Sequence, residues 1–142
     1  MSDNTIDSRQ NEIIDEFEMF SDWMEKYEHI IEIGKELETL DEVHKTDDNL
    51  IKGCQSRVWL SAELSETGRV IFKADSDAII TKGLVALMIR VLSDAEPLDI
   101  AGVELHFLEA IGLHAHLSPT RSNGLLSMVK QMKMYGLVLS AR

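Results

Sequence analysis

The sequence predicts an α+β fold, in which a small antiparallel β-sheet of two to three strands is flanked by several helices. Two short runs of apolar and β-branched residues follow one another at 58–64 and 70–74. Helical spacing of apolar side chains precedes this pair, over about residues 11–39, and returns after it. Strands that are adjacent in the sequence, without helices between them, are typical of the α+β class.

The N-terminal part is predicted to be helical after a frayed start. Residues 1–11 are polar without periodicity, which predicts a disordered extension. An apolar stripe with steps of three and four then runs through Ile13, Phe17, Phe20, Met24, Tyr27 and Ile31. Because Ser21 and Asp22 are capping residue types, the stretch is either one helix or two helices that meet at a bend. Residues 40–51 predict an irregular loop that leads into Cys54.

The centre of the chain predicts a hairpin. The strands 58–64 and 70–74 are joined by a loop of five residues, 65–69. A two-stranded sheet is marginal on its own, so we expect a third strand near residues 43–51.

The C-terminal half predicts helices. Asp75-Ser76-Asp77 supplies candidate caps for a nearly buried helix over 79–92, in which Gly83 predicts a close packing contact. The later helix signals are Pro97 at a helix start, a short helix over 107–111 that Gly112 ends, and Ser118-Pro119 at the start of a last helix that runs to near the C-terminus.

Composition and charge exclude several classes of protein. A chain of 142 residues with 44% hydrophobic and 27% charged side chains predicts one globular domain. No apolar run reaches the ~18 residues of a membrane span, and the N-terminus lacks the pattern of a signal peptide, so we expect a cytoplasmic protein with no membrane partner. The net charge of −11 disfavours nucleic acid as a partner.

The acidic charge lies mostly in the first third. Residues 1–49 carry 16 acidic and 4 basic side chains, whereas residues 50–142 carry 9 and 10. We interpret the acidic part mainly as a solvated helical face, with a docking face for a basic partner as the alternative.

Cys54 is the only cysteine, which excludes an internal disulfide, a CxxC pair, and an iron–sulfur cluster or structural zinc held by cysteines of this chain alone. A lone cysteine is either a small buried hydrophobe or a reactive thiol. Cys54 follows Gly53 between a polar loop and a strand, with Lys52 and Arg57 within three residues. Positive charge favours the thiolate, so Cys54 is the candidate nucleophile.

Other motifs of catalysis or cofactor binding are absent. There is no GxGxxG, P-loop, HExxH or nucleophile elbow, so we predict no cofactor. His114 and His116 stand two apart, as metal ligands on a strand would, but no third ligand stands near them in the sequence. We therefore predict no metal site and interpret His116 as a structural hydrogen-bonding group.

The string Gly53-Cys54-Gln55-Ser56-Arg57-Val58-Trp59 resembles the active loop of the SufE family, whose members accept sulfur from cysteine desulfurases in iron–sulfur cluster assembly. Further motifs resemble family positions in the family's order: Trp23 with Lys26-Tyr27 and Ile30-Ile31, Asp75-Ser76-Asp77-Ala78 with Lys82-Gly83-Leu84, and the segment from His116 to Leu125. The resemblance covers roughly residues 13–139. It implies a single SufE-like domain over 1–142, with a fold similar to that of IscU-type scaffolds.

The resemblance also implies a function. A pyridoxal-phosphate-dependent cysteine desulfurase, SufS-like, would hold sulfur as a persulfide, and the Cys54 thiolate would attack the outer sulfur. Cys54 would carry the sulfur as a transient persulfide to a scaffold complex of the SufBCD type. The protein would thus stimulate the desulfurase as a non-enzymatic partner without a cofactor, as a monomer or homodimer.

The resemblance assigns roles around Cys54. Gly53, Gln55 and Ser56 would shape the loop, and Arg121 would be an electrostatic partner of it, with a surface salt bridge as the alternative. Asp75 would hold the resting loop or cap a helix, and His116 would support the site. We expect Cys54 to rest in an apolar cavity beneath its loop and to swing outward when the desulfurase docks.

Two other functions compete with this one. An iron–sulfur scaffold needs several thiolates, which one cysteine does not supply. A single-cysteine thiol peroxidase is the second alternative, but the sequence lacks a thioredoxin-like βαβ pattern.

Overall fold

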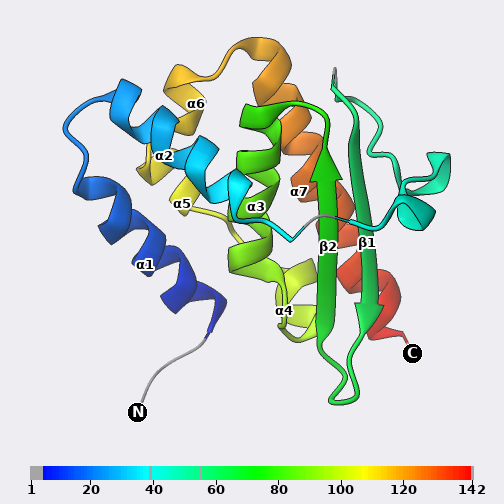
Figure 1. The fold of residues 1–142 in the computed structure, drawn as a ribbon. Helices are drawn as coiled ribbons and strands as arrows, with labels where there is room; N and C mark the ends of the chain where they lie inside the picture. The colour runs from blue at the N-terminus through cyan, green and yellow to red at the C-terminus, as the bar shows by residue number, and fades with distance from the viewer. Residues whose placement is uncertain (1–4, 39, 55, 142) are drawn as a thin grey trace.

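The computed structural model describes residues 5–38, 40–54 and 56–141. A β-hairpin lies on one side, helix α3 (Ile79–Leu92) runs through the middle, and α1 (Ile6–Glu18) and α2 (Trp23–Lys35) lie on the other side (Figure 1). The predicted α+β class is confirmed. No helix of the described part is long and apolar enough to cross a membrane.

The N-terminal region forms two helices that meet near Ser21 and Asp22, which was one of the two predicted arrangements. The Asp22 side chain caps α2 by accepting a hydrogen bond from the Glu25 amide. The predicted frayed stretch over 1–11 is wrong for residues 6–11, because α1 already begins at Ile6. Residues 1–4 of that prediction lie outside the described part.

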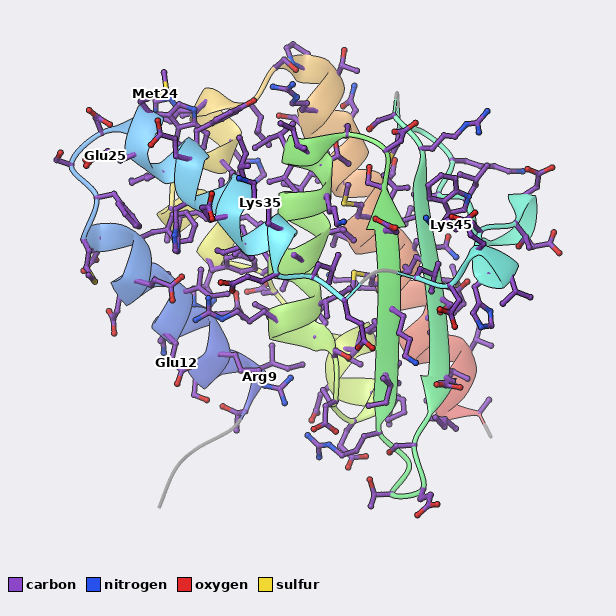
Figure 2. The ribbon with its side chains drawn as sticks, viewed as in Figure 1. Arg9, Glu12, Met24, Glu25, Lys35 and Lys45 are labelled. Atoms are coloured by element: carbon purple, nitrogen blue, oxygen red, sulfur yellow. The ribbon has the colours of Figure 1, made fainter. Side chains whose placement is uncertain are left out.

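Contacts of two polar side chains explain the early start of α1. The Arg9 guanidinium donates hydrogen bonds to the carbonyl oxygens of Val91, Ser93 and Asp94, at the C-terminal end of α3 (Figure 2). The Gln10 amide bonds the backbone of Glu104 and Phe107. These polar side chains are buried because they satisfy backbone groups of distant segments, a role that apolar periodicity does not reveal.

The hairpin forms as predicted. Strand β1 (Val58–Leu64) pairs antiparallel with β2 (Val70–Ser76), in a register that places Val58 opposite Ser76 and Leu64 opposite Val70. The expected third strand near 43–51 is wrong, because two 3₁₀ helices occupy this segment: η1 (Glu42–His44) and η2 (Asp47–Asn49). After η2, the chain contacts β1 through an isolated bridge between Leu50 and Trp59.

The core is built around α3 and takes buried side chains from the hairpin, from the last helix, α7 (Pro119–Ser140), and from the other helices. Helix α3 contributes the most buried side chains, as its broad apolar stripe predicts. A Cβ built on Gly83 would stand 2.2 Å from the Ile30 carbonyl oxygen, which confirms the predicted close contact. The predicted caps of α3 are wrong. Its N-cap is Ala78, which makes no side-chain cap bond, because Asp75 and Ser76 belong to β2.

Three short helices connect α3 to α7: α4 (Pro97–Ala101), α5 (Phe107–Ala110) and α6 (Leu113–His116). Pro97 opens α4, and Gly112 follows α5 with φ of +90°, as expected of a residue that ends a helix. Ser118 caps α7 by accepting from the Arg121 amide. Helix α7 starts at the same end of the molecule as β1 (Figure 1).

Candidate functional site

The candidate site is built on the short loop that precedes β1, residues 52–57. The Ile51 amide donates to the Val58 carbonyl at 2.8 Å, which closes the base of the loop. Gly53 has φ of +91°, a backbone conformation that side-chain-bearing residues rarely adopt. A Cβ built on Gly53 would meet the Ser127 hydroxyl of α7 at 2.5 Å, so the glycine lets the loop approach this helix. Gln55 lies outside the described residues.

The Cys54 thiol is half-buried against α7. Its Sγ donates to the Gly124 carbonyl at 3.5 Å, which is long but within range for sulfur. Burial raises the pKa of the Cys54 thiol above its ordinary value. The expectation that nearby Lys52 and Arg57 would favour the thiolate is therefore wrong for this conformation, because desolvation of the sulfur dominates.

A cavity of about 390 Å³ adjoins Cys54. Its walls come from the loop, the β2–α3 connection, α3 and α7, and are formed by Cys54, Ser56, Asp77, Ala78, Ile80, Thr81, Leu84, Thr120, Arg121, Gly124 and Met128. The expected cavity beneath the loop exists, but it is not simply apolar, because hydroxyl, carboxylate and guanidinium groups share its walls with aliphatic ones.

The C-terminal part of the loop is tied to the β2–α3 connection. The Arg57 amide donates to the Asp77 carboxylate at 3.0 Å, and its carbonyl accepts from the Ser76 hydroxyl at 2.8 Å. Ser56 donates to the hydroxyl of Thr81, on the first turn of α3, at 3.1 Å. Sequence reasoning missed Thr81, and it named Asp77 as a helix cap and as part of a family motif but not as a partner of the loop. The sequence offered one signal, the polar residues just before the apolar stripe of α3. This pattern does not show which groups those residues bind.

Asp75 is buried on β2 and does not line the cavity. Its carboxylate lies 3.0 Å from the Lys45 ammonium and 3.4 Å from that of Lys82. Burial opposes ionisation, but hydrogen bonds from Lys45 and the Ser76 amide hold the pKa of Asp75 below its ordinary value. Lys45 also lies over the Trp59 ring, beside β1 (Figure 2). Asp75 thus fastens the segment before the Cys54 loop, and it does not cap α3.

Arg121 lies on the first turn of α7, and its side chain forms part of the cavity wall. It is exposed, and no ion pair involves it within the described part of the chain, so the alternative of a surface salt bridge has no partner there. Among the described residues the positive charge of Arg121 is therefore unpaired, and it lies in the wall of the Cys54 cavity.

His116 lies on α6 and is not part of the cavity wall. Its ring stacks on Trp23 of α2, with centroids 4.5 Å apart and 10° between the planes. This ring contact joins α6 to α2, and the supporting role that the resemblance implies for His116 stays a prediction. Within the described residues, no group of three His, Cys, Asp or Glu side chains is arranged to hold a metal ion.

The geometry allows one kind of chemistry most directly: exchange of sulfur at a single, sheltered thiol. An S–S bond of about 2 Å would extend from Cys54 Sγ, and the adjoining cavity has space for the added atom. The loop is short and closed at its base, and a few hydrogen bonds hold it to its neighbours.

Comparison with known proteins agrees with this picture. The family model SufE, described as an Fe-S metabolism associated domain, matches residues 11–136. The chain is 39% identical over 131 residues to SufE-like protein 1, chloroplastic/mitochondrial, of Arabidopsis thaliana. That match covers 92% of this chain and 35% of the relative, so the chain spans about a third of the relative's length.

A solved structure shows the same fold. The solution structure of a hypothetical protein from Thermus thermophilus superimposes with a TM-score of 0.78, over 94% of this chain and 97% of that one. The sequence identity is 15%, so the likeness concerns the fold alone.

Proposed function

Because the chain belongs to the SufE family, a family of Fe–S metabolism, we propose that it accepts sulfur from a cysteine desulfurase onto Cys54 and delivers it for iron–sulfur cluster assembly. The observation that carries the proposal is the position of the only thiol. Cys54 lies on a short loop, in the wall of a cavity of about 390 Å³, with its sulfur held by one long hydrogen bond.

The transfer is a thiol exchange that needs no oxidant. The Cys54 thiolate forms a bond to the terminal sulfur of the desulfurase persulfide, while the S–S bond of the donor breaks and its cysteine leaves as a thiolate. Cys54 then carries the persulfide. The donor is freed for another cycle, so the protein stimulates the desulfurase without itself catalysing the release of sulfur from cysteine.

The resting loop suits a carrier. Burial shields the Cys54 thiol and raises its pKa, which disfavours the thiolate, so its nucleophilicity depends on a change of surroundings. We propose that docking of a SufS-like, pyridoxal-phosphate-dependent desulfurase turns the thiol outward, and that a SufBCD-type complex receives the sulfur. A thiol peroxidase needs a thiolate at rest, so the raised pKa favours the carrier over that alternative.

A loading experiment tests the proposal. After incubation with the desulfurase and cysteine, intact mass spectrometry should show a gain of about 32 Da for the wild type and none for Cys54→Ser. Serine is the matched control because it differs by one atom and cannot hold a persulfide. A wild type that gains no mass while the desulfurase turns over would contradict the proposal.

Hydrogen exchange tests the motion. Amides of residues 50–58, including that of Arg57, which is bonded to Asp77, should exchange faster when the desulfurase is bound. Unchanged exchange there would show that sulfur reaches Cys54 without loop opening.

The cytoplasmic location expected from the sequence stays a prediction, which fractionation of the source cells tests, since the Arabidopsis relative is named as chloroplastic/mitochondrial.

A further inference from the structure

Helix α3 buries one hydroxyl group, that of Thr81. The Thr81 residue is 7% exposed, and the other buried side chains of this helix carry no hydroxyl, amide or charged group. Burial of a hydroxyl costs free energy unless the group is hydrogen-bonded. Valine has nearly the same shape and would fit the apolar surface of α3 without this cost. The hydroxyl of Thr81 therefore indicates a bonding role rather than a packing role.

The Thr81 hydroxyl binds the Cys54 loop. Ser56 donates to Thr81 Oγ1 at 3.1 Å, and within the described residues this is the hydrogen bond that the Thr81 hydroxyl makes. The bonds that tie Arg57 to Asp77 and Ser76 lie at exposed positions, whereas the bond between Ser56 and Thr81 is partly buried. Because water competes less for a buried hydrogen bond, this bond is the most protected of the three.

The loop around Cys54 is thus held by two helices. On one side, the Cys54 Sγ donates to the Gly124 carbonyl of α7. On the other side, Ser56, two residues after Cys54, is bonded to Thr81 of α3. Cys54, Ser56 and Thr81 all line the same cavity. Thr81 belongs to the helix that contributes most buried side chains to the core, so it is the fixed partner of this bond, and Ser56 is the partner on the loop.

We propose that Thr81 is a positioning residue for sulfur transfer: its hydroxyl holds Ser56, keeps the Cys54 thiol at the cavity in the resting protein, and is released when the sulfur donor docks. The inference deepens the proposed function and rests on it for the transfer step. Thr81 acts through Ser56 and does not react with sulfur itself. One such hydrogen bond shifts the balance between a closed and an open loop about two- to tenfold.

Alkylation of the free protein tests the resting role. Thr81→Val should raise the rate at which iodoacetamide modifies Cys54 at pH 7 about two- to tenfold, and should move the midpoint of the pH dependence toward that of an ordinary thiol. Thr81→Ser keeps the hydroxyl and should retain the wild-type rate. A wild-type rate in Thr81→Val would overturn the proposal. So would a Thr81→Ser variant that reacts as fast as Thr81→Val, because packing would then explain the effect.

Thr67→Val is the matched control. Thr67 forms a similar pair of hydroxyls with Ser65, 3.0 Å apart, in the hairpin loop beyond the end of β1. This variant makes the same chemical change away from the Cys54 loop, so Cys54 should react at the wild-type rate. A rise equal to that of Thr81→Val would contradict a local role of Thr81.

A double-variant cycle isolates the bond. Ser56→Ala removes the donor without changing α3, so it should raise the alkylation rate by the same factor as Thr81→Val. Thr81→Val/Ser56→Ala should give no further increase. Effects that multiply in the double variant would show that the two residues act separately, which would overturn the proposal. If Thr81→Val does not fold, Ser56→Ala decides alone, and a wild-type rate in it would refute the bond as a restraint.

Loading by the desulfurase separates this inference from the proposed function. Docking that must break the bond costs less without the hydroxyl, so the apparent KM of the desulfurase for Thr81→Val should fall by about the factor seen in alkylation, with little change in kcat. An unchanged KM would remove Thr81 from the transfer step. A wild type that gains no sulfur overturns the proposed function, whereas a wild type that loads, with no effect of Thr81→Val on alkylation, overturns the role of Thr81 alone.

Discussion

At the scale of a single residue, the proposed function places two opposed requirements on Cys54: shelter as a persulfide and exposure as a nucleophile. Its half-buried position shelters the sulfur. The same burial raises the pKa of the thiol. The second requirement needs the loop to move, since Lys52 and Arg57 flank the cysteine in sequence without overcoming the desolvation of its sulfur. The proposal therefore makes the reactive form of Cys54 depend on the conformation of its loop.

Alkylation measures this shelter directly. In the free protein, the pH at which iodoacetamide modifies Cys54 at half its maximal rate should lie above that of an ordinary thiol, because the folded environment raises its pKa. The same protein unfolded in urea is the control and should show an ordinary midpoint. Equal midpoints in the folded and unfolded protein would contradict a sheltered resting thiol.

Gly53 supports the loop in two separable ways. Gly53→Ala should lower the free energy of unfolding by about 1 to 3 kcal/mol, from the positive φ and from the crowding of Ser127. Gly68→Ala is the matched control, because Gly68 has φ of +80° and an added Cβ there meets nothing within 4 Å. Chemical denaturation should show a smaller loss for Gly68→Ala.

A double variant isolates the contact. Ser127→Ala removes the hydroxyl that the new Cβ would meet, so Gly53→Ala/Ser127→Ala should recover to the level of Gly68→Ala, relative to Ser127→Ala alone. No recovery would mean that backbone strain accounts for the whole effect.

The sequence predicted the centre of the site but not its attachments. Cys54 was recognisable from its neighbours, and Arg121 follows a cap and a proline that position it at the start of α7. Thr81 and Asp77 were not found as loop partners, because their roles are pairings with Ser56 and Arg57 that are distant in sequence. Asp75 was expected to hold the resting loop or to cap a helix, and its partners are the two lysines Lys45 and Lys82.

At the scale of elements, the crossing of α2 and α3 depends on two glycines. A Cβ on Gly83 would stand 2.2 Å from the Ile30 carbonyl oxygen, and one on Gly34 would stand 2.7 Å from the Gly83 nitrogen. Contacts with backbone atoms do not relax by rotation of a side chain. The distance between the two helix axes is therefore set by the absence of side chains at these positions.

Gly83→Ala should accordingly destabilise the fold even though alanine favours helices. We expect the free energy of unfolding to fall by about 2 to 3 kcal/mol, because overpacking outweighs a helix propensity gain of about 1 kcal/mol. Gly102→Ala is the control, since its Cβ would meet only the Leu98 carbonyl at an ordinary 3.6 Å. Thermal unfolding should show a clear fall in Tm for Gly83→Ala alone, and equal Tm values would refute the packing argument.

The elements that sequence periodicity predicted are those whose stability is local or depends on one apolar face. The hairpin, α3 and α7 belong here. The errors fall where distant contacts decide: Arg9 and Gln10 extend α1 by binding backbone groups more than 80 residues away. The segment 42–49 forms no strand, and its Lys45 is paired with Asp75 of β2. Neither pairing is visible in a local pattern.

At the scale of the whole molecule, charge is distributed unevenly. The acidic first third forms mainly α1 and α2, whereas α7, which carries basic side chains and no acidic one, lies on the other side of α3 (Figure 1). An acidic side chain nevertheless connects α1 with α2 and α3. The Glu16 carboxylate accepts hydrogen bonds from Arg90 of α3 at 2.8 and 3.0 Å and lies 2.6 Å from the Nε2 of His29 of α2.

This three-helix junction makes stability depend on acid pH. The hydrogen bonds from Arg90 outweigh the opposing effect of burial and lower the pKa of Glu16 from 4.5 to about 2. A carboxyl group whose pKa is lower in the folded state stabilises the fold above its unfolded pKa. This contribution is lost as the pH falls from about 4.5 through about 2. Glu16→Gln should therefore reduce the free energy of unfolding by about 1 to 2 kcal/mol at pH 7, and the difference from wild type should disappear near pH 2.

Glu18→Gln is the control for this prediction, because it removes the same charge from an exposed position on the same helix. Urea unfolding from pH 7 to pH 2 should give parallel curves for Glu18→Gln and wild type, and converging curves for Glu16→Gln and wild type. If Glu18→Gln converged in the same way, general repulsion within a chain of net charge −11 would explain the pH dependence, and the pairing of Glu16 with Arg90 would not. Because the ion pair joins α1 to α3 while Cys54 lies at the start of β1, sulfur loading by Glu16→Gln at pH 7 should stay at the wild-type level as long as the variant is folded.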